Sequence, residues 1–390
     1  MDFDLSPADV AFRTELREWL EQHPTPDVDV AATFEEAESL RDWQRTLHGG
    51  RWVGIHWPEE YGGRGASLVQ VAIYNEELAR ARAPQILGRA GVNLVGPTLI
   101  AHGTEDQRKQ WLRKILSAEQ IWCQLFSEPG AGSDLAGLST KAEKRGDTYF
   151  VTGQKVWTSY ARFADFGIGL VRTDPTAPKH KGISMLAIPM RSDGIDVRPL
   201  RQITGESEFN EVFFDEVPVP AENLIGVEHD GWRVAGTTLA NERGTSFVWK
   251  EQVLHEVARD MLWRRAIERG ATADPLVRQK LAQSWMDVEI FRLHNARTLT
   301  RLSRGEQIGP ESSVVKLFWS EMSQRLYENA GSILGWDGLV TPEDPRALDR
   351  GRWARGMLWS RAASIAGGTS EIQRNIIAER ILGLPREPKR

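Results

Sequence analysis

The chain has 390 residues, of which 41% are hydrophobic and 26% are charged, and its formal net charge is −5. This composition is ordinary for a soluble globular protein, and the length allows two or three domains with a large core. The acidic balance gives no reason to expect nucleic acid as a partner.

Cysteine, histidine and apolar residues exclude further classes of protein. Cys123 is the only cysteine, which excludes a disulfide framework and indicates a reducing cytoplasm. No two histidines have the spacing of metal ligands, so no metal is expected. No apolar run reaches the length of a membrane span, and the acidic first ten residues do not resemble a signal peptide.

The first 120 residues carry the signals of helices. Ser6 begins one helix, since a proline follows it and Asp9 stands three residues later. Thr104 and Gln107 form a capping box at the start of another helix. Helical spacing of apolar residues places the other segments at about 33–47 and 68–82 and within 86–101. We therefore expect an N-terminal helical domain over residues 1–120.

From about Ile121 the pattern changes to short apolar or alternating runs between turn residues, which is typical of strands. Such runs lie at 149–151, 166–171, 183–188 and 212–214. We predict a middle antiparallel β domain over residues 121–230, with the proline-rich segment 217–220 at its exit.

The sequence becomes helical again from Gly231. Long amphipathic helices are predicted at about 231–269, 275–304 and 310–333, and a last helix from near Thr369 to Gly383. Helices of this length suggest a C-terminal four-helix bundle over residues 231–390. The fold class is therefore α+β multidomain, in the order helical, β, helical.

One glycine-rich stretch, CQLFSEPGAGSD at 123–134, has the character of a ligand-binding loop. Glycine lets the backbone approach a ligand closely, and the main-chain N–H groups with Ser127 and Ser133 suit phosphate or ring carbonyl oxygens. The glycine spacing is not that of the dinucleotide fingerprint. Taken alone, the stretch is equally well explained as an ordinary turn between a helix and a strand.

Three further motifs favour the ligand-binding interpretation. They are PEEYGG at 58–63, KVWTSY at 155–160 and IAGGTSEIQRNIIAERILGLP at 365–385. In this order, and together with the glycine-rich stretch, they resemble the acyl-CoA dehydrogenase family of flavoproteins over nearly the whole chain. The resemblance implies FAD, an acyl-CoA substrate, an electron-transfer flavoprotein as acceptor, and a tetramer whose neighbouring subunits share each flavin site.

The reaction implied is α,β-dehydrogenation of a thioester to the trans-2-enoyl-CoA, in which a base takes the α proton and flavin N5 receives a hydride. Many members carry the base just before the Gly-Thr of the C-terminal motif, where this chain has Gly367. Branched-chain and long-chain members, such as isovaleryl-CoA dehydrogenase, instead carry it on the first bundle helix, directly before an arginine. Glu242, which precedes Arg243, matches that position, so we expect Glu242 to be the base.

The residues around this base follow from the same resemblance. Gly367 is expected to donate its N–H to the thioester oxygen, beside a ribityl hydroxyl. Arg243 is expected to lower the pKa of the base or orient the thioester, and Asn241 to contact the substrate. A glycine at 367 leaves space near the α carbon, which suggests a branched or bulky acyl group. The alternative is that Glu242 and Arg243 form an ordinary solvated pair on a helix.

Flavin contacts are assigned position by position. Trp157 is expected to pack against the isoalloxazine ring, although it could equally belong to the core of the β domain. Ser127 corresponds to a residue beside the ring, and Ser133 to one that touches both FAD and CoA. The remaining expected cofactor-binding residues are Gln124, Leu125, Phe126 and Gly132 along the loop, Thr158 and Ser159 at the ring edge, and Thr369 and Glu371 near the adenine half at a helix start.

The contacts expected across the subunit boundary match less well. Arg264 fits an Arg-x-x-Phe motif that reaches the neighbour's FAD, but Ile267 replaces the phenylalanine. A glutamine expected shortly afterwards falls on Pro275, and a Gln-x-x-Gly-Gly motif is present only as Glu328-x-x-Gly331-Ser332. Some actinobacterial members pair two different chains as α2β2, with one base between them. The sequence therefore leaves a homotetramer and an α2β2 assembly open.

Two other functions remain open on the same fold. One is a flavin oxidase or monooxygenase, because a fold does not determine a reaction. The other is a non-catalytic subunit that only completes a partner's flavin site, which the presence of Glu242 and of an intact glycine-rich stretch disfavours.

Overall fold

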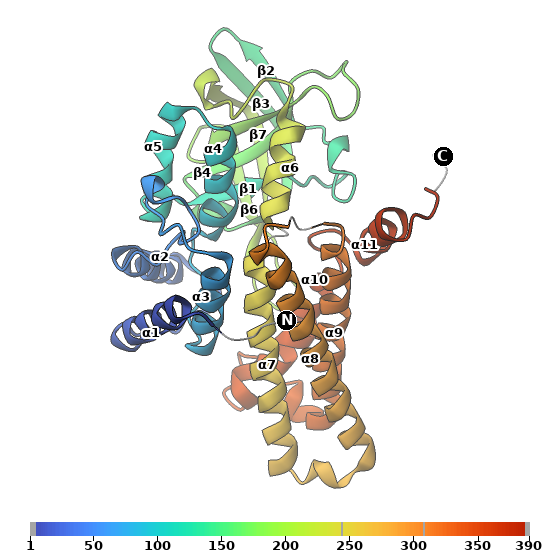
Figure 1. Cartoon of the computed structure of the whole chain (residues 1–390). Helices are drawn as coiled ribbons and strands as arrows, with labels where there is room; N and C mark the ends of the chain where they lie inside the picture. Colours follow the sequence, from blue (N-terminus) through green and yellow to red (C-terminus); the bar gives the residue numbers. More distant parts are fainter. Residues whose placement is uncertain (1–4, 243–244, 307–308, 387–390) are drawn as a thin grey trace. The chain divides into compact units, whose positions relative to one another are not determined.

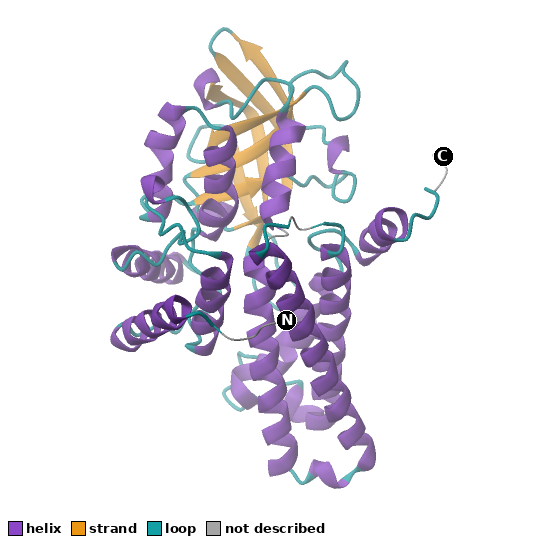
Figure 2. Cartoon of the chain, in the orientation of Figure 1, coloured by secondary structure: helices purple, strands orange, loops and turns teal. Residues whose placement is uncertain are grey.

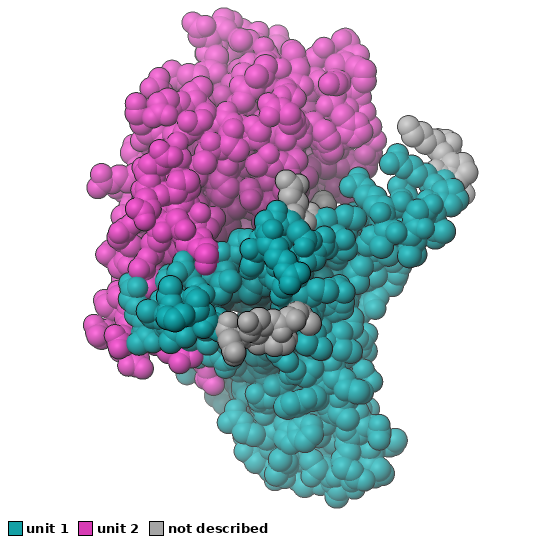
Figure 3. All heavy atoms as spheres, viewed as in Figure 1, with its two compact units in different colours: residues 1–16, 68–81, 245–390 teal, residues 17–67, 82–244 magenta. Residues whose placement is uncertain are grey.

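The chain divides into two compact units. The computed structural model describes residues 5–242, 245–306 and 309–386. We call residues 17–67 and 82–244 the sheet unit, and residues 1–16, 68–81 and 245–390 the bundle unit (Figure 3). Helices dominate the bundle unit, and all named strands belong to the sheet unit (Figure 2).

The helical segments of the first 120 residues follow the predicted order. They are α1 (Pro7–Gln22), α2 (Phe34–Gly49), α3 (Leu68–Arg80), a π-helical turn (Gly91–Val95), α4 (Gly96–His102) and α5 (Glu105–Leu116). The capping box before α5 is confirmed, because Thr104 Oγ1 accepts from the N–H of Gln107 while the Gln107 side chain accepts from the N–H of Thr104.

One sheet forms the centre of the sheet unit. In the described part of the chain it has seven strands, with β5 beside β4 and the others in the order β1-β4-β2-β3-β7-β6. Their bounds are β1 (Trp122–Leu125), β2 (Lys141–Arg145), β3 (Thr148–Ser159), β4 (Phe166–Arg172), β5 (Ile183–Pro189), β6 (Ile195–Pro199) and β7 (Phe209–Pro220).

The β domain was predicted to be antiparallel, and this is wrong for two of the pairings. Strands β1 and β4 pair in parallel along four residues, and β2 meets β4 in parallel at Lys141 and Arg172. A parallel pair needs a long crossover connection, and β2 with β3 supplies it between β1 and β4. The prolines of segment 217–220, expected at the exit of the domain, lie within β7, where Pro218 and Pro220 pair with β3.

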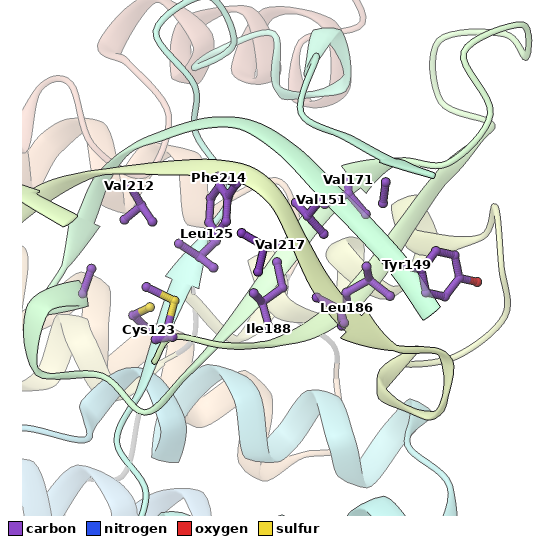
Figure 4. Close-up of a cluster of buried hydrophobic side chains, with 14 of the residues drawn as sticks. Cys123, Leu125, Tyr149, Val151, Val171, Leu186, Ile188, Val212, Phe214 and Val217 are labelled. Atoms are coloured by element: carbon purple, nitrogen blue, oxygen red, sulfur yellow. The ribbon is translucent and has the colours of Figure 1, made fainter. Parts of the chain in front are cut away.

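The core of the sheet unit is made of inward-facing strand residues (Figure 4). Cys123 and Leu125 of β1, Val151 of β3 and Leu186 of β5 are fully buried in one cluster. Around the sheet lie helices α4, α5 and α6 (Gly231–Glu242) (Figure 1). Trp111 of α5 packs edge-on against Trp122, so α5 covers the start of β1.

The bundle unit consists mainly of long helices: α7 (Thr245–Glu268), α8 (Pro275–Ser303), α9 (Ser312–Leu334), α10 (Arg352–Ala363) and the short α11 (Ser370–Ile376), followed by a π-helical turn (Ile377–Ile381). Among the described residues, α7 to α10 all contribute to one buried cluster that includes Leu262, Leu281, Leu326 and Trp353. This confirms a C-terminal helical domain. The predicted helix 231–269 corresponds to α6 and α7, with residues 243–244 outside the described part, and α10 was not predicted.

Bilayer insertion has no helical candidate here. Across the residues that the structure describes, none of the helices combines the length and the apolar character needed to cross a membrane.

Candidate active site

The predicted site residues fall into two sets, one in each unit. In the sheet unit, β1 ends at Leu125 and the chain continues into the glycine-rich loop. Leu125 and Phe126 have buried side chains, so they can offer a ligand only their main chain. Gln124 and Ser127 are half-buried. The N–H of Val156 donates to Ser127 O at 2.9 Å, which ties the start of the loop to β3.

A buried ion pair fixes this loop. Lys155 Nζ donates to Glu128 Oε1 at 2.8 Å and to Phe126 O at 3.0 Å, and both charged side chains are almost fully buried. The other oxygen of Glu128 accepts from the N–H and the hydroxyl of Ser139, each at 2.7 Å. The N–H of Thr140 donates to Oε1 at 2.9 Å. Both oxygens of this carboxylate therefore accept hydrogen bonds, as a buried charge requires.

The two partners of this pair are shifted by different causes. Burial raises the pKa of Glu128, but attraction to Lys155 and the hydrogen bonds from Lys155, Ser139 and Thr140 outweigh it and bring the pKa to about 2. Burial lowers the pKa of Lys155 to about 8, against the opposing effect of Glu128. The ion pair and the hydrogen bonds decide the direction of the pKa shift at Glu128, and burial decides it at Lys155. With these pKa values both groups are charged at neutral pH.

No role was predicted for this pair from the sequence, although a signal for it exists. Tyr149, Val151 and Lys155 occupy alternate positions of β3 and are all buried. A lysine in the inward phase of a strand needs a buried acceptor. Glu128 is the first carboxylate after the apolar residues of β1. A contact between the stretches 123–134 and 155–160 was therefore predictable from the sequence.

A bulge in β3 presents Trp157. The register against β7 shifts between Lys155 and Thr158, and Trp157 has a left-handed backbone with φ +60°. Its side chain is 60% exposed, and its ring meets Phe209 edge-on at 6.0 Å. An extra residue in a strand re-aims side chains locally, and such bulges are common beside active sites. Trp157 is therefore not part of the β core, which leaves its ring available to a planar ligand.

The two residues after Trp157 lie on opposite faces of β3. The Thr158 side chain is fully buried, and its carbonyl accepts from Asn210 Nδ2 at 2.9 Å. Ser159 is half-buried, and Arg89 Nη2 lies 3.5 Å from its hydroxyl. The bulge thus leaves Trp157 and Ser159 on the accessible face of β3, whereas Thr158 faces the core. Only the main chain of Thr158 can bond a ring on that face.

The tip of the glycine-rich loop is open. The N–H groups of Glu128 and Ala131 each donate to the other residue's carbonyl, at 3.1 and 3.0 Å, which closes a tight turn. A Cβ placed on Gly130 or Gly132 would meet nothing within 4 Å, and neither residue has a positive φ. Nothing within the described chain thus requires glycine here, as expected if a ligand occupies the space. Ser133 beside them is exposed.

In the bundle unit, three of the predicted residues lie in the turn between α10 and α11 or at the start of α11. They are Gly367, Thr369 and Glu371. Gly367 and Gly368 both have positive φ, +63° and +92°, and a Cβ on Gly367 would face open space. Thr369 caps α11, since its Oγ1 accepts from the N–H of Ile372 at 3.2 Å. The Glu371 carboxylate is exposed and pairs with Arg374, so it offers a phosphate only its main chain.

The remaining predicted residues are placed less completely. Arg264 is exposed on α7. Asn241 is half-buried near the end of α6, and Glu242 is the last residue of that helix, but the structure does not describe the Glu242 side chain. The Arg243 prediction lies outside the described residues.

The residues of the sheet unit fit a flavin. An exposed tryptophan on a bulge, a serine on the same face and two glycines with open space beside them can hold a flat ring and an attached pyrophosphate. The buried Glu128–Lys155 pair keeps these elements in place. Among the described residues no cluster of acidic, histidine and cysteine side chains forms a metal site.

Comparison with protein families covers the chain in three parts. The model of the N-terminal domain of acyl-CoA dehydrogenases matches residues 6–119, that of the middle domain matches 123–217, and that of the C-terminal domain matches 229–382.

Individual relatives match over nearly the full length. Acyl-CoA dehydrogenase IpdE1 of Mycolicibacterium smegmatis is 40% identical, covering 97% of this chain and 98% of the relative. A solved structure described as Tcur3481-Tcur3483 steroid ACAD has 30% identity, a TM-score of 0.90 and coverage of 99% and 100%. The ChsE4-ChsE5 complex from Mycobacterium tuberculosis has 30% identity, a TM-score of 0.84 and the same coverage. The chain therefore belongs to the acyl-CoA dehydrogenase family, whose members use FAD, and it is an acyl-CoA dehydrogenase.

Proposed function

We propose that the chain oxidises an acyl-CoA thioester to the trans-2-enoyl-CoA, with Glu242 as the base that takes the α proton. The observation that carries this proposal is the open turn at Gly367, where no side chain is present and a Cβ would meet nothing within 4 Å. A base must therefore come from another element. Glu242 is the carboxylate that the sequence offers, at the end of α6 and directly before an arginine.

Helix α6 is a firm support for such a base. One turn before Glu242, Thr238 is fully buried and its hydroxyl lies 2.8 Å from that of Thr98 in α4. Thr237 bonds His102 Nε2 at 2.7 Å. At the other end, a Cβ on Gly231 would come within 2.5 Å of the main chain of Ser184, so α6 lies directly on β5. Rigid positioning of a base within hydrogen-bond reach of its proton is a requirement of general base catalysis.

The residues of the chain then have these roles. Glu242 removes the proton from the α carbon, and the N–H of Gly367 donates to the thioester oxygen as negative charge develops there. FAD, when bound, would supply the hydride acceptor for the β carbon. Trp157 and Ser159 would hold its ring, and the open glycine-rich loop would receive its phosphates. An electron-transfer flavoprotein is the proposed acceptor of the electrons.

The proposed substrate is a bulky acyl-CoA. The space at Gly367 supports it, and two of the similar solved structures are described as a steroid ACAD. A preference for straight chains of medium length in steady-state turnover would contradict this assignment.

We also propose that the working enzyme contains a second, related chain, as α2β2. The imperfect match around Arg264, with Ile267 and Pro275 in place of the expected residues, supports a partner that is not identical. One similar solved structure is described as the ChsE4-ChsE5 complex, and another is described under the two names Tcur3481-Tcur3483. A stable homotetramer that retains FAD and full activity would contradict this part of the proposal.

Anaerobic bleaching of flavin absorbance tests the function. The FAD-loaded protein, prepared alone and with candidate partner chains, is mixed with a panel of acyl-CoA thioesters. We expect the wild type to bleach and Glu242→Gln to stay oxidised while it still binds the thioester. Glu222→Gln, at an exposed position of the same unit, is the matched control and should bleach like the wild type.

The other outcomes separate the alternatives. Equal bleaching by wild type and Glu242→Gln would keep the activity and remove Glu242 as the base. Rapid production of peroxide in air would indicate an oxidase. Flavin that is retained only with a partner chain, and bleaches regardless of Glu242, would place the base on that partner.

A further inference from the structure

Lys316 of α9 makes a contact that the proposed roles do not use. Its Nζ donates to Gly368 O at 2.7 Å and to Ala363 O, at the end of α10, at 2.9 Å. The ammonium therefore bridges the last turn of one helix and the second glycine of the turn that follows it. Both partners are main-chain carbonyls.

No carboxylate neutralises this ammonium within the described part of the chain. The charged groups nearby on α9, α10 and α11 pair with one another: Arg374 with Glu321 and Glu371, and Arg361 with Glu328. Burial lowers the pKa of Lys316 to about 8. Burying an ammonium without a carboxylate partner costs free energy. Its hydrogen bonds to these two carbonyls are what offset that cost.

A second side chain holds the same turn. Gln373 of α11 is buried, and its Nε2 donates to Gly367 O at 3.0 Å and to Gly368 O at 3.2 Å. A Cβ on Gly368 would come within 2.7 Å of that nitrogen. The glycine is thus needed for the side chain to reach the carbonyls.

These bonds orient the N–H groups of the turn. The C=O and N–H of a trans peptide point in opposite directions. The N–H groups of Gly368 and Thr369 consequently point away from Lys316 and Gln373. The N–H of Gly367 lies between two anchored groups, because the N–H of Ala366 donates to Ala362 O at 2.9 Å and Gly367 O is held by Gln373.

We infer that Lys316 is a positioning residue for the reaction: it holds the Gly367–Gly368 turn so that the N–H of Gly367 faces the thioester oxygen. This inference rests on the proposed function. The lysine acts through the main chain and does not touch the substrate. A misplaced donor stabilises developing charge poorly, and a displacement of about 1 Å can cost roughly a hundredfold in rate.

The test compares Lys316→Met and Lys316→Arg with the wild type in the FAD-loaded enzyme. We expect Lys316→Met to lower kcat roughly ten- to a hundredfold with little change in KM or flavin content, and Lys316→Arg to restore part of the loss. The wild-type kcat should fall above about pH 8 as the amine loses its proton, and Lys316→Arg should lack that decline because guanidinium stays charged.

Amide hydrogen exchange supplies a measurement that does not depend on activity. In protein without substrate, we expect the peptide that covers residues 363–370 to exchange roughly tenfold faster in Lys316→Met, with other peptides unchanged. Lys109→Met is the control, because Lys109 is exposed on α5 and pairs with Glu105, away from the turn and from every predicted site residue. It should leave both exchange and kcat as in the wild type.

The outcomes distinguish this inference from the proposed function. A wild type that no thioester reduces contradicts the proposed function. An active wild type with unchanged kcat in Lys316→Met contradicts only the role of Lys316. A loss confined to flavin content or melting temperature also contradicts it. If Lys316→Met does not fold, the pH profiles of the wild type and of Lys316→Arg decide, and equal alkaline declines overturn the inference.

Discussion

The proposed flavin-binding surface around Trp157 and Ser159 depends on the buried pair of Glu128 and Lys155. Glu128→Gln keeps the shape of the side chain but leaves the Lys155 ammonium buried without a counter-charge. We expect the free energy of unfolding to fall by about 3–5 kcal/mol, measured by urea denaturation at pH 7. The double variant Glu128→Gln/Lys155→Met should recover part of the loss, because it leaves no unpaired charge.

The same pair predicts a dependence on acid. The pKa of Glu128 in the folded protein is about 2, below its usual 4.5. The stability it contributes is therefore fully present above about pH 4.5 and is lost as the pH falls toward 2. Glu128→Gln should lack this part of the acid dependence. Glu143→Gln, at an exposed pair with Arg145, is the control and should leave the stability close to that of the wild type.

Ser159 and Thr158 give a matched test of which face of β3 meets the flavin. Ser159→Ala should raise the Kd for FAD roughly two- to tenfold, because one hydrogen bond to the ring edge is lost. Thr158→Val should leave that Kd unchanged and should not destabilise the protein, since Thr158 Oγ1 has no partner among the described residues. Titration of flavin-free protein with FAD measures both. A larger effect from Thr158→Val would place the ring on the other face.

At the scale of single residues, the sequence indicated which residues belong to the predicted site better than it indicated the direction of their side chains. It placed Trp157, Thr158 and Ser159 together at the ring, but the bulge at Trp157 decides which of them face outward. A bulge depends on register with β7, which is distant in the sequence. Lys155 was predictable from alternation alone, because its phase matches that of Tyr149 and Val151.

Strand β3 carries Trp157 and Ser159, and Gly153 is the position of this strand where a larger side chain is tolerated least. Gly153 has φ +152°, and a Cβ there would lie within 2.6 Å of Thr140 Oγ1 and 2.7 Å of its Cα. Gly153→Ala should destabilise the protein by about 1–3 kcal/mol and weaken FAD binding, because β3 must move away from β2. Urea denaturation and FAD titration measure the two effects. Gly146→Ala also has a positive φ but open space around it, so it should show strain without the loss of FAD affinity.

Elements with local signals were predicted, and elements defined by packing were not. The caps before α2 and α5 and the proline at the start of α8 all have sequence signatures. Helix α10 was missed because its buried face is made largely of small or polar residues such as Gly356 and Ser360. A Cβ on Gly356 would come within 2.2 Å of the Tyr327 ring, so the close approach of α9 replaces the usual apolar stripe.

At the scale of the whole molecule, the order of segments with helical, strand and helical sequence patterns was enough to predict the fold class. Each of these segments extends over a hundred residues or more. Three family models match in that order. Assembly is different, since it depends on which surfaces remain apolar after folding. The proposal that Glu242 is the base comes from the sequence, because the structure does not describe that side chain.

The bundle unit displays such a surface along α7 and α8. Trp263 and Trp285 meet edge-on at 6.2 Å and both remain partly exposed. Met286, Ile290 and Leu293 follow at helical spacing, and each is exposed by about two-fifths or more. Exposed apolar groups at this spacing are typical of a helix that packs against another chain.

Met286→Asp tests whether this surface holds the assembly together. A buried charge would weaken association at least tenfold, so the variant should shift to a smaller species in light scattering after size exclusion and should retain less FAD. Val10→Asp, at an equally exposed position of α1, is the control and should keep the wild-type mass. If Met286→Asp dissociates neither a homomeric nor a mixed assembly, the chains meet through another surface. If it dissociates only the mixed assembly, this face of α7 and α8 is where the related chain binds, and the altered motif around Arg264 belongs to that contact.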